Sequence, residues 1–226
     1  MDTLSVPPFN TVAAGFVLEQ LGFHIPNPDN FLIYANVAPR DDSDVPRKDN
    51  EGEPLVFVRL ENDVPIVTTR SGFILSFVKP WIEEAREMDV KRNGSQFRSR
   101  DIFPEAVERV LKGEEQEITS SQLDPDEIPD RPEYRIAYID GFGNLKTTIR
   151  ESEVEGKHGK NVEVCVNGRK MIMERADGIF GVEPRDKVFA PGSSGGSDPY
   201  MEIVKRGASV ESEIGGVEPG DRIQLR

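Results

Sequence analysis

The sequence has 226 residues and a mass of 25.3 kDa, which allows one large domain or two small ones. With 28 Lys and Arg residues against 41 Asp and Glu residues, its net charge is −13, which disfavours binding to nucleic acid or to an anionic membrane. A single cysteine, Cys165, excludes an intrachain disulfide bond, and two distant histidines, His24 and His158, give no zinc-binding pattern. No apolar run is long enough to span a membrane, and no signal-peptide pattern opens the sequence, so we expect a cytoplasmic location and no membrane partner.

The first half of the sequence alternates between helical and strand patterns. Helices are predicted over residues 8–21, 80–88 and 104–112. Asn10 is a candidate N-cap for the first, Pro80 stands at a helix-opening position, and Asp101 is available to cap the third. Strands and further apolar runs are predicted over residues 31–38, 55–60, 65–69 and 72–78. The polar segment 40–54 is interpreted as an exposed loop.

The composition changes after this half. Residues 114–133 contain eight acidic residues, one arginine and three prolines, which is typical of a linker or an extended surface strap. Short strands are then predicted over residues 134–140, 145–149, 162–166, 169–174, 187–190, 200–205 and 222–225, with a tight hairpin turn at Asn167-Gly168. We therefore predict an α/β domain over residues 1–118, an acidic linker over 119–132, and an all-β, barrel-like domain over 133–226.

The densest group of candidate functional residues is the segment YIDGFGNL, residues 138–145. Gly141 and Gly143 let the backbone bend tightly, which would push Phe142 outward as a stacking platform, while Asn144 offers both a donor and an acceptor. The alternative is an ordinary tight hairpin in which Asp140 caps the turn and Phe142 lies in the core.

Two further segments are candidates. The loop GSSGGS, residues 192–197, has amides and hydroxyls that would cradle a carboxylate or a phosphate, or it is simply a flexible connection. The segment FRSRDIFP, residues 97–104, places arginine and aspartate just before a helix, where they would form a cap and an ion pair or contribute to a site.

Four segments, in this order, resemble one known family. Residues 6–20 read VPPFNTVAAGFVLEQ, 98–113 read RSRDIFPEAVERVLKG, 139–149 read IDGFGNLKTTI, and 193–209 read SSGGSDPYMEIVKRGAS. Together they resemble the S-adenosyl-L-methionine hydroxide adenosyltransferases, relatives of the fluorinase and chlorinase enzymes. That family displaces methionine from the adenosyl C5′ atom with hydroxide or halide.

The resemblance implies a fold, an assembly and a site. It implies an α/β domain followed by a β-barrel, and a homotrimer in which one subunit's N-terminal domain and a neighbour's C-terminal domain share a small adenosyl ligand. S-adenosylmethionine would be substrate or ligand, with no other cofactor. By position, Asp140, Phe142 and Asn144 would face the adenine or methionine portion, and Ser193, Ser194, Tyr200 and Glu202 would close over the base.

The sequence departs from the family pattern at its catalytic positions. The family's opening TDFG-like motif has no counterpart, and its VDPGVGTxRR loop corresponds to a segment beginning Val37-Ala38, in which only Arg47 stands in for the arginine. Arg47 is therefore the one catalytic candidate. Arg98 replaces the family's histidine, and neither Ala38 nor a protonated arginine serves as a base. Two functions follow: a divergent hydrolase that gives adenosine and methionine, or a degenerate paralogue acting as an adenosyl-binding or structural trimer without turnover.

Overall fold

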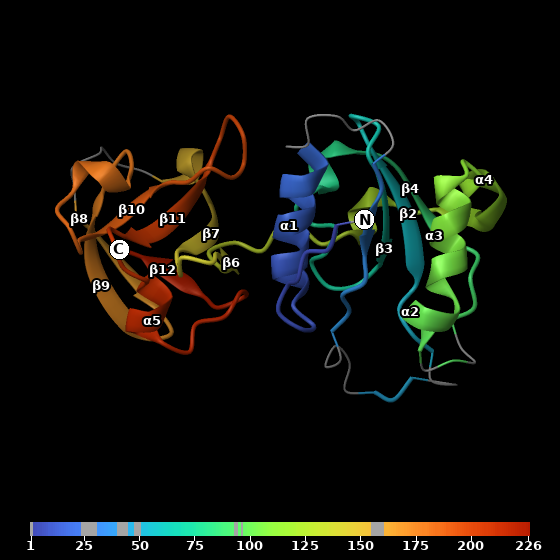
Figure 1. Cartoon of the computed structure of the whole chain (residues 1–226), viewed down its shortest axis with the longest axis horizontal. Coiled ribbons are helices and arrows are strands. Elements are labelled where there is room, and N and C mark those ends of the chain that lie inside the picture. The colour runs from blue at the N-terminus through green and yellow to red at the C-terminus, as the bar shows by residue number, and fades with distance from the viewer. Residues whose placement is uncertain are drawn as a thin grey trace. The chain divides into compact units, whose positions relative to one another are not determined.

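The chain divides into two compact units, Met1–Asp130 and Arg131–Arg226, each with its own sheet and core (Figure 1). The computed structural model describes residues 2–23, 31–39, 45–47, 51–92, 95, 97–154 and 161–226. The first unit is mixed α/β and the second is a nearly closed β barrel, which confirms the predicted fold class. Both histidines lie outside the described residues.

The first unit is built on a five-stranded sheet in the order β1-β3-β2-β4-β5. The strands are β1 (Ile33–Ala35), β2 (Leu55–Leu60), β3 (Pro65–Thr69), β4 (Ile82–Met88) and β5 (Thr119–Gln122). β1 and β3 pair in parallel, whereas the other neighbours are antiparallel. Because β1 and β3 run the same way, the loops that follow them leave from the same edge of the sheet.

Helices cover both faces of this sheet (Figure 1). Successive side chains of a strand point to opposite faces, so β2 contributes to two cores. Val56 and Val58 pack in the cluster that includes Leu18 of helix α1 (Thr11–Phe23). Leu55 and Phe57 pack with residues of helix α3 (Phe103–Leu111). This double burial explains why β2 reads as an almost continuous apolar run.

Of the two predicted side-chain caps, Asn10 is confirmed and Asp101 is not. The side chain of Asn10 accepts a hydrogen bond from the Ala13 amide at 2.9 Å, which confirms it as the cap of α1. The Asp101 cap was wrong, because α3 begins after Ile102 and has no side-chain cap. Asp101 lies at the end of the short helix α2 (Arg98–Asp101), where it accepts hydrogen bonds from Arg100 and Ser95 instead.

The helix predicted over residues 80–88 is strand β4. Pro80 lies within a single 3₁₀ turn, Lys79–Trp81, and the chain then pairs with β2 from Ile82 onward. Ala85 and Met88 are buried in the cores of the unit. Strand pairing in the sheet therefore overrides a pattern of Glu and Arg residues that favours a helix when it is considered alone.

The acidic segment 119–132 was expected to be a linker, but most of it belongs to the first unit. A short helix α4 (Glu115–Ile118) leads into β5, which pairs with β4 and forms the edge of the sheet. Leu123 and Ile128 are 5 % and 3 % exposed and pack in the α1-side core. Two spaced apolar residues thus anchor a segment whose composition is otherwise that of a solvated connection.

The second unit is a seven-stranded sheet in the order β12-β8-β9-β10-β11-β7-β6. The strands are β6 (Ile136–Ile139), β7 (Leu145–Arg150), β8 (Asn161–Val166), β9 (Arg169–Arg175), β10 (Lys187–Pro191), β11 (Tyr200–Lys205) and β12 (Ile223–Leu225). The ends approach each other, since the Ile136 amide donates to the Asp221 carbonyl at 2.9 Å and the Ile223 amide to that of Tyr134 at 2.8 Å. These two bonds nearly close the barrel.

The turn predicted between β8 and β9 is confirmed. Asn167 and Gly168 have φ angles of +50° and +79°, the left-handed pair that a two-residue hairpin requires. One element was not predicted, the short helix α5 (Val210–Ile214). The side chain of Ser209 caps it by accepting from the Ser212 amide at 2.9 Å, and Val210 and Ile214 are buried in the barrel core.

Candidate functional site

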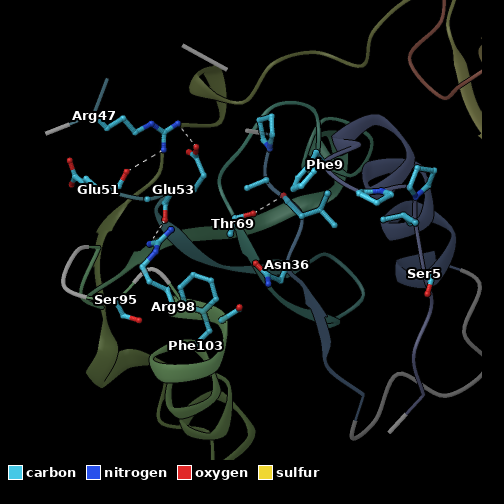
Figure 2. Close-up of a pocket in the computed structure, with 18 of the residues that line it drawn as sticks. Ser5, Phe9, Asn36, Arg47, Glu51, Glu53, Thr69, Ser95, Arg98 and Phe103 are labelled. Atoms are coloured by element: carbon cyan, nitrogen blue, oxygen red, sulfur yellow. Dashed lines mark hydrogen bonds and ion pairs between the residues drawn. The ribbon is translucent and has the colours of Figure 1, made fainter. Parts of the chain in front are cut away.

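A pocket of about 730 Å³ lies in the first unit, where the chain leaves β1 and β3 (Figure 2). Its lining comes from residues 4–9, 36–39, 47, 51–53, 69, 95, 98, 99 and 103. The carbonyl of Val37 anchors the loop after β1, because it accepts hydrogen bonds from the buried hydroxyls of Thr69 and Ser71, each at 2.9 Å. The sheet thereby fixes one wall of the pocket.

Arg47, the predicted catalytic residue, lines this pocket. Its Nη2 atom donates to Oε1 of Glu53, whose side chain is only 12 % exposed. Figure 2 shows the two side chains meeting over the segment that carries Glu51 and Glu53. Arg47 is always protonated and orients or binds anions, whereas the Glu53 carboxylate is a group that can accept a proton.

Arg98 lies between Glu53 and Phe103 in the same pocket (Figure 2). Its Nη1 atom donates to the Glu53 carbonyl at 2.8 Å, and its guanidinium carbon lies 5.1 Å from the centre of the Phe103 ring. Burial is the largest influence on the pKa of Arg98 and lowers it, although the group remains a cation at neutral pH. The ion pair expected in this segment is formed by Arg100 and Asp101, with an N–O distance of 2.6 Å, whereas the expected helix cap is absent.

The FGN turn, residues 140–144, is organised by Asp140. One carboxylate oxygen accepts from the amides of Phe142 and Asn144 at 2.9 and 3.0 Å, and the other accepts from Nδ2 of Asn144 at 3.0 Å. Gly143 has a φ of +77°, and a Cβ there would lie 2.0 Å from Oγ of Ser209. The turn is therefore built from several interlocking contacts.

Phe142 projects from this turn and is 82 % exposed. The alternative in which it is a core residue is therefore wrong. The side-chain nitrogen of Asn144 donates to Asp140, and the side-chain oxygen of Asn144 accepts no hydrogen bond from a described residue. An exposed aromatic ring beside a side-chain acceptor is the combination that can stack on a base and accept from an amino group.

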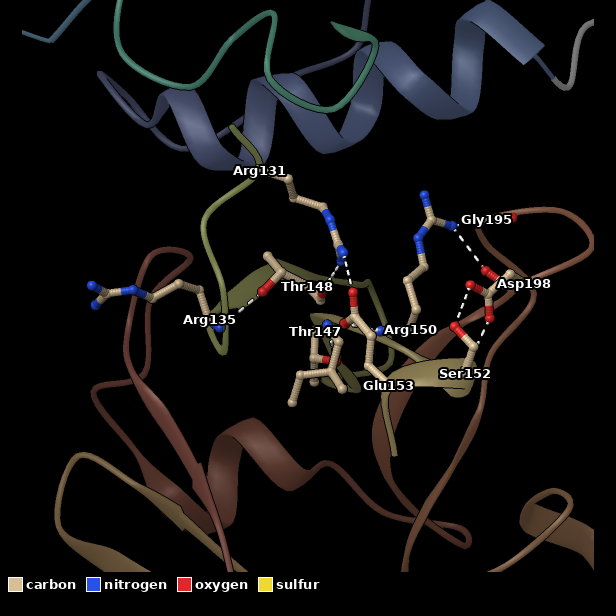
Figure 3. Close-up of polar contacts among 10 residues, drawn as sticks. Arg131, Arg135, Thr147, Thr148, Arg150, Ser152, Glu153, Gly195 and Asp198 are labelled. Atoms are coloured by element: carbon tan, nitrogen blue, oxygen red, sulfur yellow. Dashed lines mark hydrogen bonds and ion pairs between the residues drawn. The ribbon is translucent and has the colours of Figure 1, made fainter. Parts of the chain in front are cut away.

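The loop before β11 is held by Arg150 (Figure 3). The Nη1 atom of Arg150 donates to the carbonyls of Gly195 and Asp198 at 3.1 and 2.9 Å. The Asp198 carboxylate in turn accepts from the hydroxyl and amide of Ser152 at 2.7 and 3.1 Å. This loop is thus braced by the end of β7 and is not merely a flexible connection.

Within this loop, the predicted ligand residues differ in accessibility. Ser193 is exposed and Ser194 is 7 % exposed, and the hydroxyl of neither makes a hydrogen bond to a described residue. Tyr200 is fully buried, with the guanidinium carbon of Arg150 at 3.6 Å from its ring centre and that of Arg131 at 5.5 Å. Two arginines of the same unit therefore cover the Tyr200 ring.

Glu202 also faces inward. It is 6 % exposed and forms an ion pair with Lys146, at an N–O distance of 2.5 Å. A Cβ on Gly192 would lie 1.8 Å from its carboxylate, so the loop backbone packs directly against this pair. The carboxylate is thus already engaged within the unit.

The structure places the two predicted ligand loops at opposite ends of one strand pair. Leu145, next to the FGN turn, pairs with Ile203, and Arg150 pairs with Tyr200, next to Ser193 and Ser194. Three steps along β11 separate these positions, roughly 10 Å. A ligand in contact with both loops of one unit must therefore extend along the strands.

Sequence reasoning missed several residues of these sites. Glu53 and Gly52 lie in a polar segment with no motif, and Lys146 and Arg150 look like ordinary strand residues. Arg47 and Arg98 of the first-unit pocket were both singled out from the sequence. Among the described residues, no cluster of three His, Cys, Asp or Glu side chains suits a metal ion, and no helix is long and apolar enough to cross a membrane.

Comparison with known proteins identifies the fold first. The chain is similar to the crystal structure of an uncharacterized conserved protein from Thermotoga maritima, with a TM-score of 0.75 and 22 % identity over 99 % of this chain and 87 % of that one. A conserved hypothetical protein from Thermus thermophilus gives a TM-score of 0.65 and 17 % identity, over 98 % and 84 % of the two chains. No curated protein matches the sequence.

A family model matches the second unit. Residues 134–224 match the model of the SAM hydroxide adenosyltransferase C-terminal domain, where SAM is S-adenosylmethionine. The match covers 91 of the 226 residues, all in the second unit, and confirms the resemblance of the FGN and SSG segments at the level of this domain. The match includes Asp140, Phe142, Asn144, Ser193, Ser194, Tyr200 and Glu202.

Proposed function

We propose that the chain binds S-adenosylmethionine and hydrolyses the bond between its sulfonium sulfur and C5′, giving adenosine and methionine. The observation that carries this proposal is the match of residues 134–224 to the C-terminal domain of SAM hydroxide adenosyltransferases. We further propose a cytoplasmic homotrimer, in which the ligand lies between the N-terminal unit of one subunit and the C-terminal unit of a neighbour.

In this proposal, the FGN turn holds the adenosyl group. The exposed ring of Phe142 stacks on the adenine, and the Asn144 carbonyl oxygen accepts from its amino group. Asp140 supports them by fixing the turn, since its carboxylate already accepts three hydrogen bonds. The hydroxyls of Ser193 and Ser194 bind a more distant part of the same extended ligand.

The chemical step is a displacement at C5′. A water oxygen forms a bond to C5′ as the C5′–S bond breaks, and its electron pair remains on sulfur, which converts the sulfonium into the neutral thioether of methionine. The water loses one proton. Glu53 in the first-unit pocket is the group we propose as acceptor, and Arg47 holds its carboxylate in place by the ion pair.

Binding without turnover is the second candidate function. It is favoured by the residues at the family's catalytic positions, where Ala38 has no ionisable group and Arg98 is a permanent cation. Both residues line the first-unit pocket, so the pocket differs from that of an active member at the very positions that handle the proton.

Calorimetric titration with S-adenosylmethionine and with adenosine, followed by chromatography of the products, separates these functions. Release of adenosine and methionine supports hydrolysis, and Glu53→Gln should then slow turnover by about 10²–10⁴-fold. Binding without products supports the second function. Absence of binding by both compounds contradicts both.

Two phenylalanines of the second unit provide a matched pair of variants. Phe142→Ala should weaken ligand binding by roughly 5- to 150-fold, the value of a lost base stack of ~1–3 kcal/mol. Phe180→Ala is the control, because Phe180 is 87 % exposed but lies outside the turn. Asn144→Ala should weaken binding by about 0.5–1.5 kcal/mol.

Light scattering tests the proposed homotrimer, and a stable monomer at micromolar concentration contradicts it.

A further inference from the structure

Arg98 carries a charge that the described part of the chain does not neutralise by an ion pair. Its single hydrogen bond there goes to the main-chain carbonyl of Glu53, so four of its five N–H groups have no described partner. The neighbouring arginines differ: Arg47 pairs with Glu53, and Arg92 pairs with Glu51 at 3.1 Å. Glu53 and Glu51 favour the charge of Arg98 from beyond ion-pair distance. A half-buried guanidinium that touches no described carboxylate is nevertheless unfavourable unless something else satisfies its donors.

The guanidinium is nevertheless held in one place. The Phe103 ring lies on one side, and a Cβ on Gly52 would lie 1.9 Å from Nη2 and 2.2 Å from Cζ. The group therefore lies against the bare backbone of Gly52, in a position that only glycine leaves open. A fixed guanidinium fork loses little entropy on binding and matches the two oxygens of a carboxylate or phosphate.

Neutral groups line the same pocket. The side chains of Asn36 and Ser99 make no hydrogen bond to any described residue, and both line the pocket that Arg98 faces. Their amide and hydroxyl groups can donate to further oxygens of an anion. The carboxylates of the pocket, Glu51 and Glu53, are each engaged by another arginine.

We propose that Arg98 is the centre of an oxyanion-binding subsite in the first-unit pocket, which takes a phosphate or carboxylate group. The anion is either free or part of an organic molecule, and the chemistry of recognition is the same for both. This proposal does not rest on the adenosyl function, because all residues of the subsite belong to the first unit.

The test is calorimetry of the full chain at low ionic strength with inorganic phosphate and with adenosine 5′-monophosphate. We expect binding of at least one of the two, and tenfold or greater preference for the monophosphate identifies an organic ligand, whereas equal or better binding of phosphate identifies a free anion. Arg98→Gln should weaken binding by about 10- to 150-fold, the range of a hydrogen bond to a charged group. The anion affinity of Arg98→Lys should lie between those of the parent protein and Arg98→Gln, since lysine keeps the positive charge but lacks the planar fork of donors.

Two further variants make the test specific. Arg100→Gln is the matched control, because Arg100 is two residues away, is 72 % exposed at its side chain and pairs with Asp101. Gly52→Ala keeps every charge but displaces the guanidinium, so it should also lose about tenfold or more in affinity. Thermal unfolding confirms that each variant is folded. Failure of the parent protein to bind either anion, or an equal loss in Arg98→Gln and Arg100→Gln, overturns the proposal, and full affinity in Gly52→Ala overturns its geometry.

Discussion

Arg98 in the first unit and Arg150 in the second make the same kind of contact with different consequences. Each lies over an aromatic ring, that of Phe103 at 5.1 Å and that of Tyr200 at 3.6 Å. Arg150 also donates to two loop carbonyls, whereas Arg98 donates to one and faces a pocket. The comparison shows two roles for an arginine over an aromatic ring. It stabilises the fold where protein acceptors satisfy its N–H donors, and it is a candidate binding group where those donors are left open.

The difference extends to the surroundings of each arginine. In the second unit, charged side chains near Arg150 pair with each other, as the buried ion pair between Lys146 and Glu202 shows. In the first-unit pocket, Glu53 and Glu51 pair with Arg47 and Arg92, whereas Arg98 forms no ion pair with a described residue. We therefore expect substitutions around Arg150 to affect stability, and substitutions in the first-unit pocket to affect binding.

The largest expected effect is at the buried ion pair. The side chains of Lys146 and Glu202 are only 13 % and 8 % exposed, so Lys146→Met leaves a carboxylate buried without its partner. The free energy of unfolding should fall by about 3–5 kcal/mol, measured by denaturant titration. The double variant with Glu202→Met should recover most of this loss. A single variant as stable as the parent protein would show that Glu202 reaches water.

The direct comparison of Arg150 and Arg98 comes next. Arg150→Met removes two hydrogen bonds to loop carbonyls and the contact over Tyr200, and should cost about 2–4 kcal/mol of unfolding free energy. Arg98→Met loses one carbonyl bond and a longer contact over Phe103, but it also removes a half-buried cation that touches no described carboxylate, so stability should change by no more than about 1 kcal/mol. Calorimetric unfolding measures both. Equal losses of unfolding free energy in the two variants would contradict the distinction between a structural role for Arg150 and a binding role for Arg98.

Much of the fold could be predicted from the sequence, because it follows from local patterns. β2, β3 and the Asn167-Gly168 turn are encoded by neighbouring residues, and each was located correctly. β4 was not, since its strand form depends on pairing with β2, a partner more than twenty residues away. The linker predicted over residues 119–132 differs from the structure for a related reason. Leu123 and Ile128 are too few to change the composition of this acidic segment, yet both are buried.

The candidate sites show the same limit. The glycine spacing of the FGN segment predicted a tight turn but left Phe142 either outward or in the core, and only the structure shows that it is exposed. The inward position of Tyr200 depends on Arg131 and Arg150, which reach it from other parts of the chain. The meeting of Gly52, Glu53 and Arg98 likewise depends on tertiary contacts between segments about 45 residues apart.

A smaller stability effect is expected at Phe142. Because its side chain is 82 % exposed, Phe142→Ala should change the unfolding free energy by no more than about 0.5 kcal/mol. Phe103→Ala is the internal standard, since that ring is 2 % exposed and its loss should cost about 3–5 kcal/mol. A large fall in the melting temperature of Phe142→Ala would mean that the ring packs against protein, which would weaken its assignment as a stacking surface.

The smallest expected effect is the contribution of a surface network in the second unit. Glu213 pairs with Lys187 and Lys205, and hydrogen bonds from these two side chains hold the pKa of its carboxyl below the usual value. A carboxyl whose pKa is lowered by folding stabilises the protein above its unfolded pKa, and this stabilisation is lost as the pH falls through the folded value. Its side chain is 38 % exposed, so solvent screening limits the effect to about a few tenths of a kcal/mol. Carboxyl NMR titration should give a low pKa for Glu213, rising with salt, and Glu213→Gln should flatten the acid limb of stability slightly. An unshifted pKa would mean that the two lysines do not hold the carboxylate in solution, leaving the buried Lys146–Glu202 pair as the better example of internal charge pairing in the second unit.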